Sequence, residues 1–233
     1  MANTNNQGAP TANEALNTRE AFFLKYKKPI FAAVAAVIIV IAGLLLYQSY
    51  VSGPREDKAS TALAKGQQYF NAEQFEVALK GDSTGYAGFA KIADDYSGTK
   101  AGNLANLYAG LCSANLGKWG DAVKYLEDFS TASDAMVSPA AKAALGNAYA
   151  QIGNTDKAIS LLKKAADMAD SKGLDGVNTS LSPTFLLQAG QLLESQGKKA
   201  EALEVYQNIK KKYVNAAMVQ NTDIDKYIQR VSE

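Results

Sequence analysis

The residue types that carry most enzyme chemistry are nearly absent from this chain. It has no histidine, which removes the commonest general base and every histidine-containing nucleophile pair or metal site. The single cysteine, Cys112, lies in an apolar helical stretch and can form neither an internal disulfide nor a cysteine-based zinc site. The adjacent carboxylates Asp94-Asp95 and Glu127-Asp128 point in different directions on a helix. We therefore expect no catalytic residue, no metal and no cofactor, so the protein is not expected to be an enzyme.

Two short segments match acceptor patterns for glycans. Asp82-Ser83-Thr84 resembles an O-glycosylation motif of some bacteria, and Asn178-Thr179-Ser180 is an N-glycosylation sequon. Both lie where turn residues are expected for structural reasons alone. Whether Ser83, Thr84 or Asn178 carries a glycan therefore stays open.

The charge balance argues against a nucleic-acid partner. Lysine and arginine number 24 and aspartate and glutamate 23, which gives a formal net charge of +1 without any basic arm or stripe. The 47% hydrophobic composition is that of a globular protein. We expect protein partners and no binding of nucleic acid.

A glycine, a second glycine seven residues later and an alanine five residues after that recur along the chain. The three complete copies are Gly110/Gly117/Ala122, Gly146/Gly153/Ala158 and Gly190/Gly197/Ala202. A weaker copy, Gly66/Glu73/Ala78, has Glu73 in place of the second glycine. Self-similarity at such fixed offsets indicates a repeat architecture of helical hairpins.

Each copy predicts two amphipathic helices joined by a tight turn. The second glycine ends the first helix in a left-handed conformation, and the other two small residues let the helices approach closely. Ser138-Pro139 and Ser182-Pro183 are expected to open the third and fourth copies, with serine as the N-cap and proline at the first helical position. The fold class is therefore all-α.

Two insertions lengthen the spacing between copies. Residues 80–85 interrupt the second helix of the first copy, and residues 171–182 lengthen the loop between the third and fourth. We expect a repeat domain of about four copies over residues 58–215 and a capping helix over residues 216–233.

An apolar segment precedes the repeats. Ile30 to Tyr47 is a run of 18 uncharged residues, which as a helix covers about 27 Å, close to the hydrocarbon thickness of a bilayer. We expect a transmembrane signal-anchor helix over residues 30–50, followed by a linker over residues 51–57. The alternative, a cleaved signal peptide, stays open although no A-x-A cleavage site follows the run.

The charged residues beside the run predict its orientation. Four basic residues, Arg19, Lys25, Lys27 and Lys28, precede it, whereas the charges that follow it are balanced. The positive-inside rule then makes residues 1–29 a disordered cytoplasmic tail and places the repeats on the other side of the membrane.

The repeats resemble the tetratricopeptide repeat (TPR). The family has a small residue at its eighth position, glycine at its fifteenth, an aromatic residue at its seventeenth and alanine at its twentieth. These places, with the aromatic or leucine that follows, are filled by Gly110, Gly117, Trp119, Ala122 and Leu126, by Gly146, Gly153, Ala158 and Leu162, and by Gly190, Gly197, Ala202 and Tyr206. Thr155 and Lys199 depart from the aromatic place. The resemblance implies a TPR helical-hairpin solenoid preceded by one transmembrane helix.

The layout of one uncleaved span before such repeats is similar to that of the YfgM-like family of ancillary subunits of the bacterial SecYEG translocon. The turn Asp94 to Ala101 adds to this resemblance. It implies a single-pass protein of the bacterial inner membrane with a cytoplasmic N-terminus and a periplasmic TPR domain. Its implied partners are Sec translocon subunits, a periplasmic chaperone or client polypeptides.

In the TPR family the first helix of each repeat lines a concave groove. The resemblance places ten partner-binding residues there: Gln67, Asn71, Leu107, Leu111, Asn115, Asn147, Gln151, Leu187, Gln191 and Glu194. The family's carboxylate clamp needs a lysine where this chain has Leu63, Leu107, Ala143 and Leu187. An acidic C-terminal peptide is therefore a poor ligand, and neutral or weakly apolar segments suit the groove better.

These expectations lead to a membrane-anchored TPR protein–protein interaction module near the Sec translocon and periplasmic chaperones. The alternative is a structural scaffold for a cell-envelope assembly with no chaperone or translocon role. Whether the chain forms a homo-oligomer also stays open.

Overall fold

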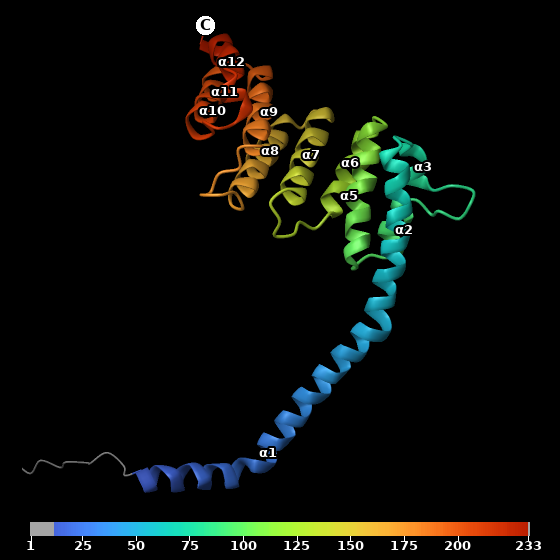
Figure 1. Cartoon of the computed structure of the whole chain (residues 1–233), viewed down its shortest axis with the longest axis vertical. Coiled ribbons are helices and arrows are strands. Elements are labelled where there is room, and N and C mark those ends of the chain that lie inside the picture. The colour runs from blue at the N-terminus through green and yellow to red at the C-terminus, as the bar shows by residue number, and fades with distance from the viewer. Residues whose placement is uncertain (1–11, 233) are drawn as a thin grey trace, which may run out of the picture. The chain divides into compact units, whose positions relative to one another are not determined.

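The computed structural model describes residues 12–232, and its regular structure there is helical apart from one isolated β-bridge between Leu174 and Val177 (Figure 1). The chain divides into two compact units, Met1–Pro54 and Arg55–Glu233. The all-α repeat fold expected from the glycine spacing is confirmed.

The first unit contains the apolar run. Helix α1 extends over Ala12–Tyr47 and continues into a π-helical turn, η1, over Gln48–Ser52. Within the helical stretch Lys25–Asn71, an 18-residue window reaches a mean hydropathy of 2.9, so this stretch is long and apolar enough to cross a membrane. A membrane anchor and a signal sequence both have this property.

Two segments expected to lack regular structure are helical. The predicted disordered tail is helical from Ala12 onward, and its first eleven residues lie outside the described part of the chain. The predicted linker over residues 51–57 is helical as well, because helix α2 begins at Gly53. Helix α2 follows η1 without a break, because Gly53 keeps right-handed helical φ and ψ values of −61° and −58° and donates its N–H to the Gln48 carbonyl. The predicted linker therefore does not interrupt the helical stretch, and Gly53 and Pro54 lie within it.

The second unit consists of hairpins in the predicted register. The first copy comprises α2 (Gly53–Asn71), α3 (Phe75–Lys80) and α4 (Phe89–Asp95). The next three are α5 (Lys100–Asn115) with α6 (Trp119–Asp128), α7 (Val137–Gln151) with α8 (Thr155–Asp170), and α9 (Ser182–Ser195) with α10 (Lys199–Lys212). The short α11 (Ala217–Gln220) and α12 (Asp223–Ser232) follow.

The hairpin turns have the left-handed backbone that the second glycine of each copy predicts. Gly117, Gly153 and Gly197 have φ values of +71°, +83° and +73°. Glu73, which replaces glycine in the first copy, has a φ of +57°. The turn geometry of the first copy is therefore kept at the cost of backbone strain.

The first glycine of each regular copy lies where the two helices cross. A Cβ added at Gly110 would lie 2.6 Å from Cγ of Leu126, and one at Gly190 would lie 2.2 Å from Cε1 of Tyr206. At Gly146 the nearest atom, Cγ of Leu162, is 3.1 Å away. In all three copies the facing side chain comes sixteen residues after the glycine. The predicted close approach of the helices is confirmed.

The insertion in the first copy changes this contact without removing it. Gly66 faces Tyr86 and Phe89 instead of the residue sixteen positions later, which is Asp82. The Asp82 carboxylate accepts hydrogen bonds from the backbone N–H groups of Thr84 and Tyr86, both at 2.8 Å. The Tyr86 hydroxyl then donates to the Ala78 carbonyl at 2.8 Å. Two aromatic side chains thus replace the missing part of the second helix.

The C-terminal helices close the core of the last hairpin. Ile224 and Val231 of α12 are buried in the same cluster as Ile209 and Tyr213, at and just after the end of α10. Helix α12 packs on α10, where it covers an apolar face that no further repeat covers.

We predict that Gly190→Ala destabilises the repeat unit more than Gly146→Ala. The new Cβ would press against the fully buried ring of Tyr206, and such overpacking costs about 1–3 kcal/mol, more than the gain in helix propensity. At Gly146 the larger space leaves the two effects nearly balanced. Urea unfolding of the detergent-solubilised chain, followed by circular dichroism, measures both; equal midpoints would contradict the proposed crossing.

We predict that Glu73→Gly stabilises the first copy by about 0.5–1 kcal/mol. Glycine adopts the left-handed conformation without strain, although part of the gain is lost to the greater freedom of the unfolded chain. The matched control is Gln74→Gly, because Gln74 has an ordinary φ of −83° and the change should destabilise. Thermal unfolding of the two variants should shift in opposite directions.

Candidate functional site: the first helices of the repeats

The ten predicted groove residues lie on the first helices of the four copies. Gln67 and Asn71 are on α2, Leu107, Leu111 and Asn115 on α5, Asn147 and Gln151 on α7, and Leu187, Gln191 and Glu194 on α9. The structure places three of them against the core: Leu107 is buried, and Leu111 and Leu187 pack on buried clusters. These leucines support the helices that carry the polar positions.

Four of the polar positions have hydrogen-bond partners. The amide of Gln67 donates to the Tyr108 hydroxyl at 3.0 Å, and that of Asn147 donates to Oε1 of Gln188 at 3.3 Å. The Asn115 amide donates to the carbonyl of Leu111 on its own helix. Glu194 pairs with Arg230 of α12 at 2.8 Å. No hydrogen bond between described residues joins two of the ten positions on different helices.

The predicted groove positions that are both polar and exposed are all amides. Asn71, Asn115, Asn147, Gln151 and Gln191 are exposed on four successive first helices. Each amide offers donors and an acceptor that suit a peptide backbone. Of the four places where the family has a clamp lysine, Leu63, Leu107 and Ala143 are buried in this chain and Leu187 is partly buried.

A carboxylate from outside the helix fixes the start of α5. Glu56 of α2 accepts the backbone N–H groups of Lys100 and Ala101 at 2.7 and 2.9 Å. Thr99 accepts the N–H of Gly102 at 2.9 Å. These bonds satisfy the free donors of the first turn and hold α2 and α5 in a fixed relation.

Asp134 has the corresponding role for α7, and this corrects the expected serine cap. Its carboxylate accepts the backbone N–H groups of Met136, Val137 and Ser138. Ser138 is buried within the first turn and donates its hydroxyl to Asp134 at 2.5 Å. The serine therefore supports the capping carboxylate instead of capping the helix itself.

Ser182 is also not an N-cap. It is buried at the first residue of α9, and its hydroxyl donates to Oδ1 of Asp170 at 2.6 Å. The Asn178 side chain accepts the N–H of Leu181 at 2.8 Å. The expected cap fails because Leu181 is the N-cap, so the Ser-Pro pair lies one residue deeper in the helix than the local rule assumes, against the end of α8.

Asp170 joins the third copy to the fourth. Besides Ser182, its carboxylate accepts hydrogen bonds from Lys212 at 2.6 Å, Tyr213 at 2.7 Å and the Asn178 N–H at 2.9 Å. Burial alone would raise the pKa of Asp170, but these four donors outweigh it and hold the pKa below its usual value. The position of α9 therefore depends on a charged, fully bonded carboxylate.

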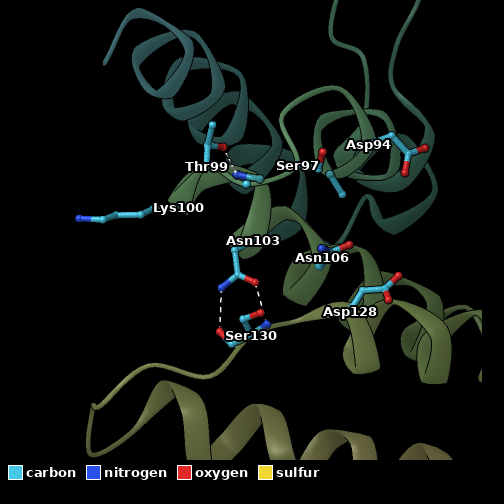
Figure 2. Close-up of a pocket in the computed structure, with 11 residues that line it drawn as sticks. Asp94, Ser97, Thr99, Lys100, Asn103, Asn106, Asp128 and Ser130 are labelled. Atoms are coloured by element: carbon cyan, nitrogen blue, oxygen red, sulfur yellow. Dashed lines mark hydrogen bonds between the residues drawn. The ribbon is translucent and has the colours of Figure 1, made fainter. Parts of the chain in front are cut away.

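A polar cleft of about 650 Å³ lies beside the start of α5 (Figure 2). The side chain of Asn103 both donates to and accepts from the backbone of Ser130, which holds one wall together. Asp94, Asn106 and Asp128 line the cleft, and Lys100 extends away from them. Sequence reasoning did not identify this cleft, although the Asp94 to Ala101 turn forms part of its wall.

The adjacent carboxylate pairs and the single cysteine, which were considered as reactive groups, either bond to other side chains or are buried. Asp95 pairs with Lys91 at 2.9 Å while its neighbour Asp94 lines the cleft, so this carboxylate pair diverges as expected. Glu127 bonds to Tyr149 and Lys157. Cys112 is fully buried, and burial raises the pKa of its thiol to about 12, which keeps it protonated near neutral pH.

The sequence profile of the tetratricopeptide repeat-like domain family matches residues 20–225. The chain belongs to this tetratricopeptide repeat-like family. The matched range includes the apolar run as well as the repeats. Members of repeat families of this kind typically bind other proteins and are not catalytic, and no enzyme family matches the chain.

A solved structure shares the fold. It is the crystal structure of a variant of the nearly identical TPR-like repeats of a putative kinesin light chain from Podosopora anserina. Its TM-score to this chain is 0.54. Sequence identity is 12%, and the match covers 76% of this chain and 94% of that one. No curated protein sequence matches the chain. At this identity the similarity concerns the fold alone.

We predict that Asp170→Asn lowers the stability of α9 and α10 by about 1–3 kcal/mol at pH 7, because an amide cannot accept from Lys212, Ser182 and Tyr213 together. The pKa of Asp170 is lower in the folded than in the unfolded chain. Asp170 therefore adds to the free energy of unfolding above its unfolded pKa of about 4, and this stabilisation is lost as the pH falls through its folded pKa. Amide hydrogen exchange of α9 measures the effect.

Two comparisons test that interpretation. The difference between the wild-type chain and Asp170→Asn should shrink below about pH 4. Asp167→Asn, a change at an exposed carboxylate one turn earlier on α8, should leave protection of α9 unchanged. Equal effects of the two substitutions would show that general charge, and not the bonded network, stabilises α9.

Proposed function

We propose that this protein is a membrane-anchored interaction module whose repeats bind other polypeptides. The proposal is carried by the row of exposed amide side chains on the four first helices, within a chain of the tetratricopeptide repeat-like family. Each amide can exchange its hydrogen bonds with water for bonds to a bound backbone. The apolar residues at the clamp positions leave no cation there for a terminal carboxylate.

The apolar run is proposed as the anchor, with residues 1–29 in the cytoplasm. Lys25, Lys27 and Lys28 precede the run, whereas Arg55, Glu56, Asp57 and Lys58 follow it with balanced charge. The positive-inside rule then favours repeats on the opposite side, which in a bacterial inner membrane is the periplasm.

We further propose Sec translocon subunits, periplasmic chaperones and emerging client polypeptides as partners. The support is the layout of one span before repeats, which this chain shares with the YfgM-like family. Uncharged amides with supporting leucines suit neutral segments of an unfolded chain better than charged peptides.

Site-specific photo-crosslinking in membranes tests the proposal. A photoreactive residue at Gln151 or Gln191 should capture translocon, chaperone or client polypeptides. The same residue at Gln207, an exposed glutamine on the second helix α10, is the matched control and should capture few. Combining the probe at Gln151 with Gln191→Ala should reduce capture about fivefold if one hydrogen bond of about 1 kcal/mol is lost.

The same experiment distinguishes the alternative of a structural scaffold. Crosslinks from Gln151 and Gln191 only to other copies of this chain would contradict a chaperone or translocon role. Equal capture at Gln207 would contradict the groove as the binding face.

A further inference from the structure

The structure distinguishes the two segments that match glycan-acceptor patterns. Asn178 is half-buried, and its side-chain oxygen accepts the backbone N–H groups of Ser180 and Leu181 at 3.1 and 2.8 Å. The backbone N–H of Asn178 donates to the Asp170 carboxylate at 2.9 Å. A transferase could modify the Asn178 amide only by drawing it out of these bonds at the start of α9. Asn178 therefore has a structural role in this turn.

Ser83, in the other segment, is both exposed and unbonded. It lies in a turn of the insertion between α3 and α4, and its hydroxyl bonds to no other residue within the described part of the chain. The neighbouring Thr84 hydroxyl, in contrast, donates to the Asp82 carboxylate at 2.9 Å. Of the two hydroxyl groups in this segment, the fold leaves that of Ser83 available for reaction.

One carboxylate holds the turn that presents Ser83. Asp82 accepts the backbone N–H groups of Thr84 and Tyr86, both at 2.8 Å, and the hydroxyl of Tyr69 from α2. The hydrogen bonds from Tyr69 and Tyr86 hold the pKa of Asp82 well below its usual value, so the carboxylate stays charged near neutral pH. Ser83 is thus presented between two residues whose positions are fixed by hydrogen bonds.

The surroundings of Ser83 have room for a bulky group. A Cβ added at Gly85, two residues later, would meet no atom within 4 Å. In Figure 1 the segment between α3 and α4 extends outward from the first hairpin. Surface loops of this kind accept large, solvated groups without any change in a core.

The insertion meets α2 on a side that differs from the predicted groove. Tyr86, near the end of the insertion, lies against Gly66 of α2. The groove residue Asn71 comes five residues after Gly66, which places it about 140° further around the helix. A group attached to the insertion therefore leaves the side of α2 that carries Asn71 open.

We infer that Ser83 is the acceptor of an O-linked glycan. The serine oxygen attacks the anomeric carbon of a glycosyl phosphate donor, so a new carbon–oxygen bond forms at that carbon. The bond from the same carbon to the phosphate oxygen breaks, the phosphate leaves with the bonding electrons, and the serine proton passes to a base of the transferase. The inference uses the acceptor pattern Asp82-Ser83-Thr84 and the exposure of Ser83, and it does not depend on the proposed anchor or partners.

Peptide mass spectrometry of the full chain, isolated from the cells in which it is native, tests the inference. Trypsin cleaves after Lys80 and Lys91 and releases peptide 81–91, whose only serine and threonine are Ser83 and Thr84. This peptide should carry added sugar masses, and electron-transfer fragmentation should place them on Ser83. The added mass should be lost in Ser83→Ala and restored in Ser83→Thr, which keeps the hydroxyl group.

The matched control is Ser180→Ala, which changes an exposed serine in the other insertion and should leave peptide 81–91 modified. Circular dichroism of Ser83→Ala should match that of the wild-type chain, because the substitution removes an exposed, unbonded hydroxyl. An unmodified peptide 81–91 in the wild-type chain would overturn the inference. Sugar masses that fragmentation places on Thr84 would overturn it as well. Either result would leave the proposed groove and anchor unaffected.

Discussion

The repeat unit depends on one close helix crossing that recurs in each hairpin. A glycine of the first helix faces a large side chain of the second helix, and no Cβ keeps the backbones apart. Leu126, Leu162 and Tyr206 fill this space sixteen residues after their glycines. With the fully buried alanines of the second helices, this contact gives each hairpin a dense interior. The hairpins then bury their remaining apolar faces by stacking on one another.

The hairpins could be predicted from the sequence because their determinants are local. A left-handed turn and a close crossing both require glycine at fixed offsets, so the spacing alone places the helices. Glu73 adopts the same left-handed backbone conformation although glutamate disfavours it, because the helices on both sides determine the turn. The repacking of the first copy could not be predicted, since it depends on how Asp82 bonds to Tyr86 and how Tyr86 fills the space beside Gly66.

The errors concern helix starts, where local rules compete with distant partners. Ser182 was expected to cap a helix, an expectation that follows good sequence statistics. In the structure the donors of α5 are satisfied by Glu56, 44 residues earlier, and the serine hydroxyl is turned to Asp170. A rule that considers only neighbouring residues cannot anticipate such a partner. The groove positions have the same limitation, since Leu111 shares the register of Gln67, Asn147 and Gln191 but packs on a buried cluster that includes the next hairpin.

Four carboxylates that bond within the chain help to explain which surface groups remain for partners. Glu56, Asp134 and Asp170 are bonded to the first turns of the helices that carry the groove, and Glu194 is paired with Arg230. These four carboxylates are therefore engaged within the chain, and the exposed groove positions are uncharged amides. Such a surface favours segments by their backbone more than by their charge. In the proposed function such a module gains selectivity from where it is held, so the proposed anchor would be as important to its action as the predicted groove residues.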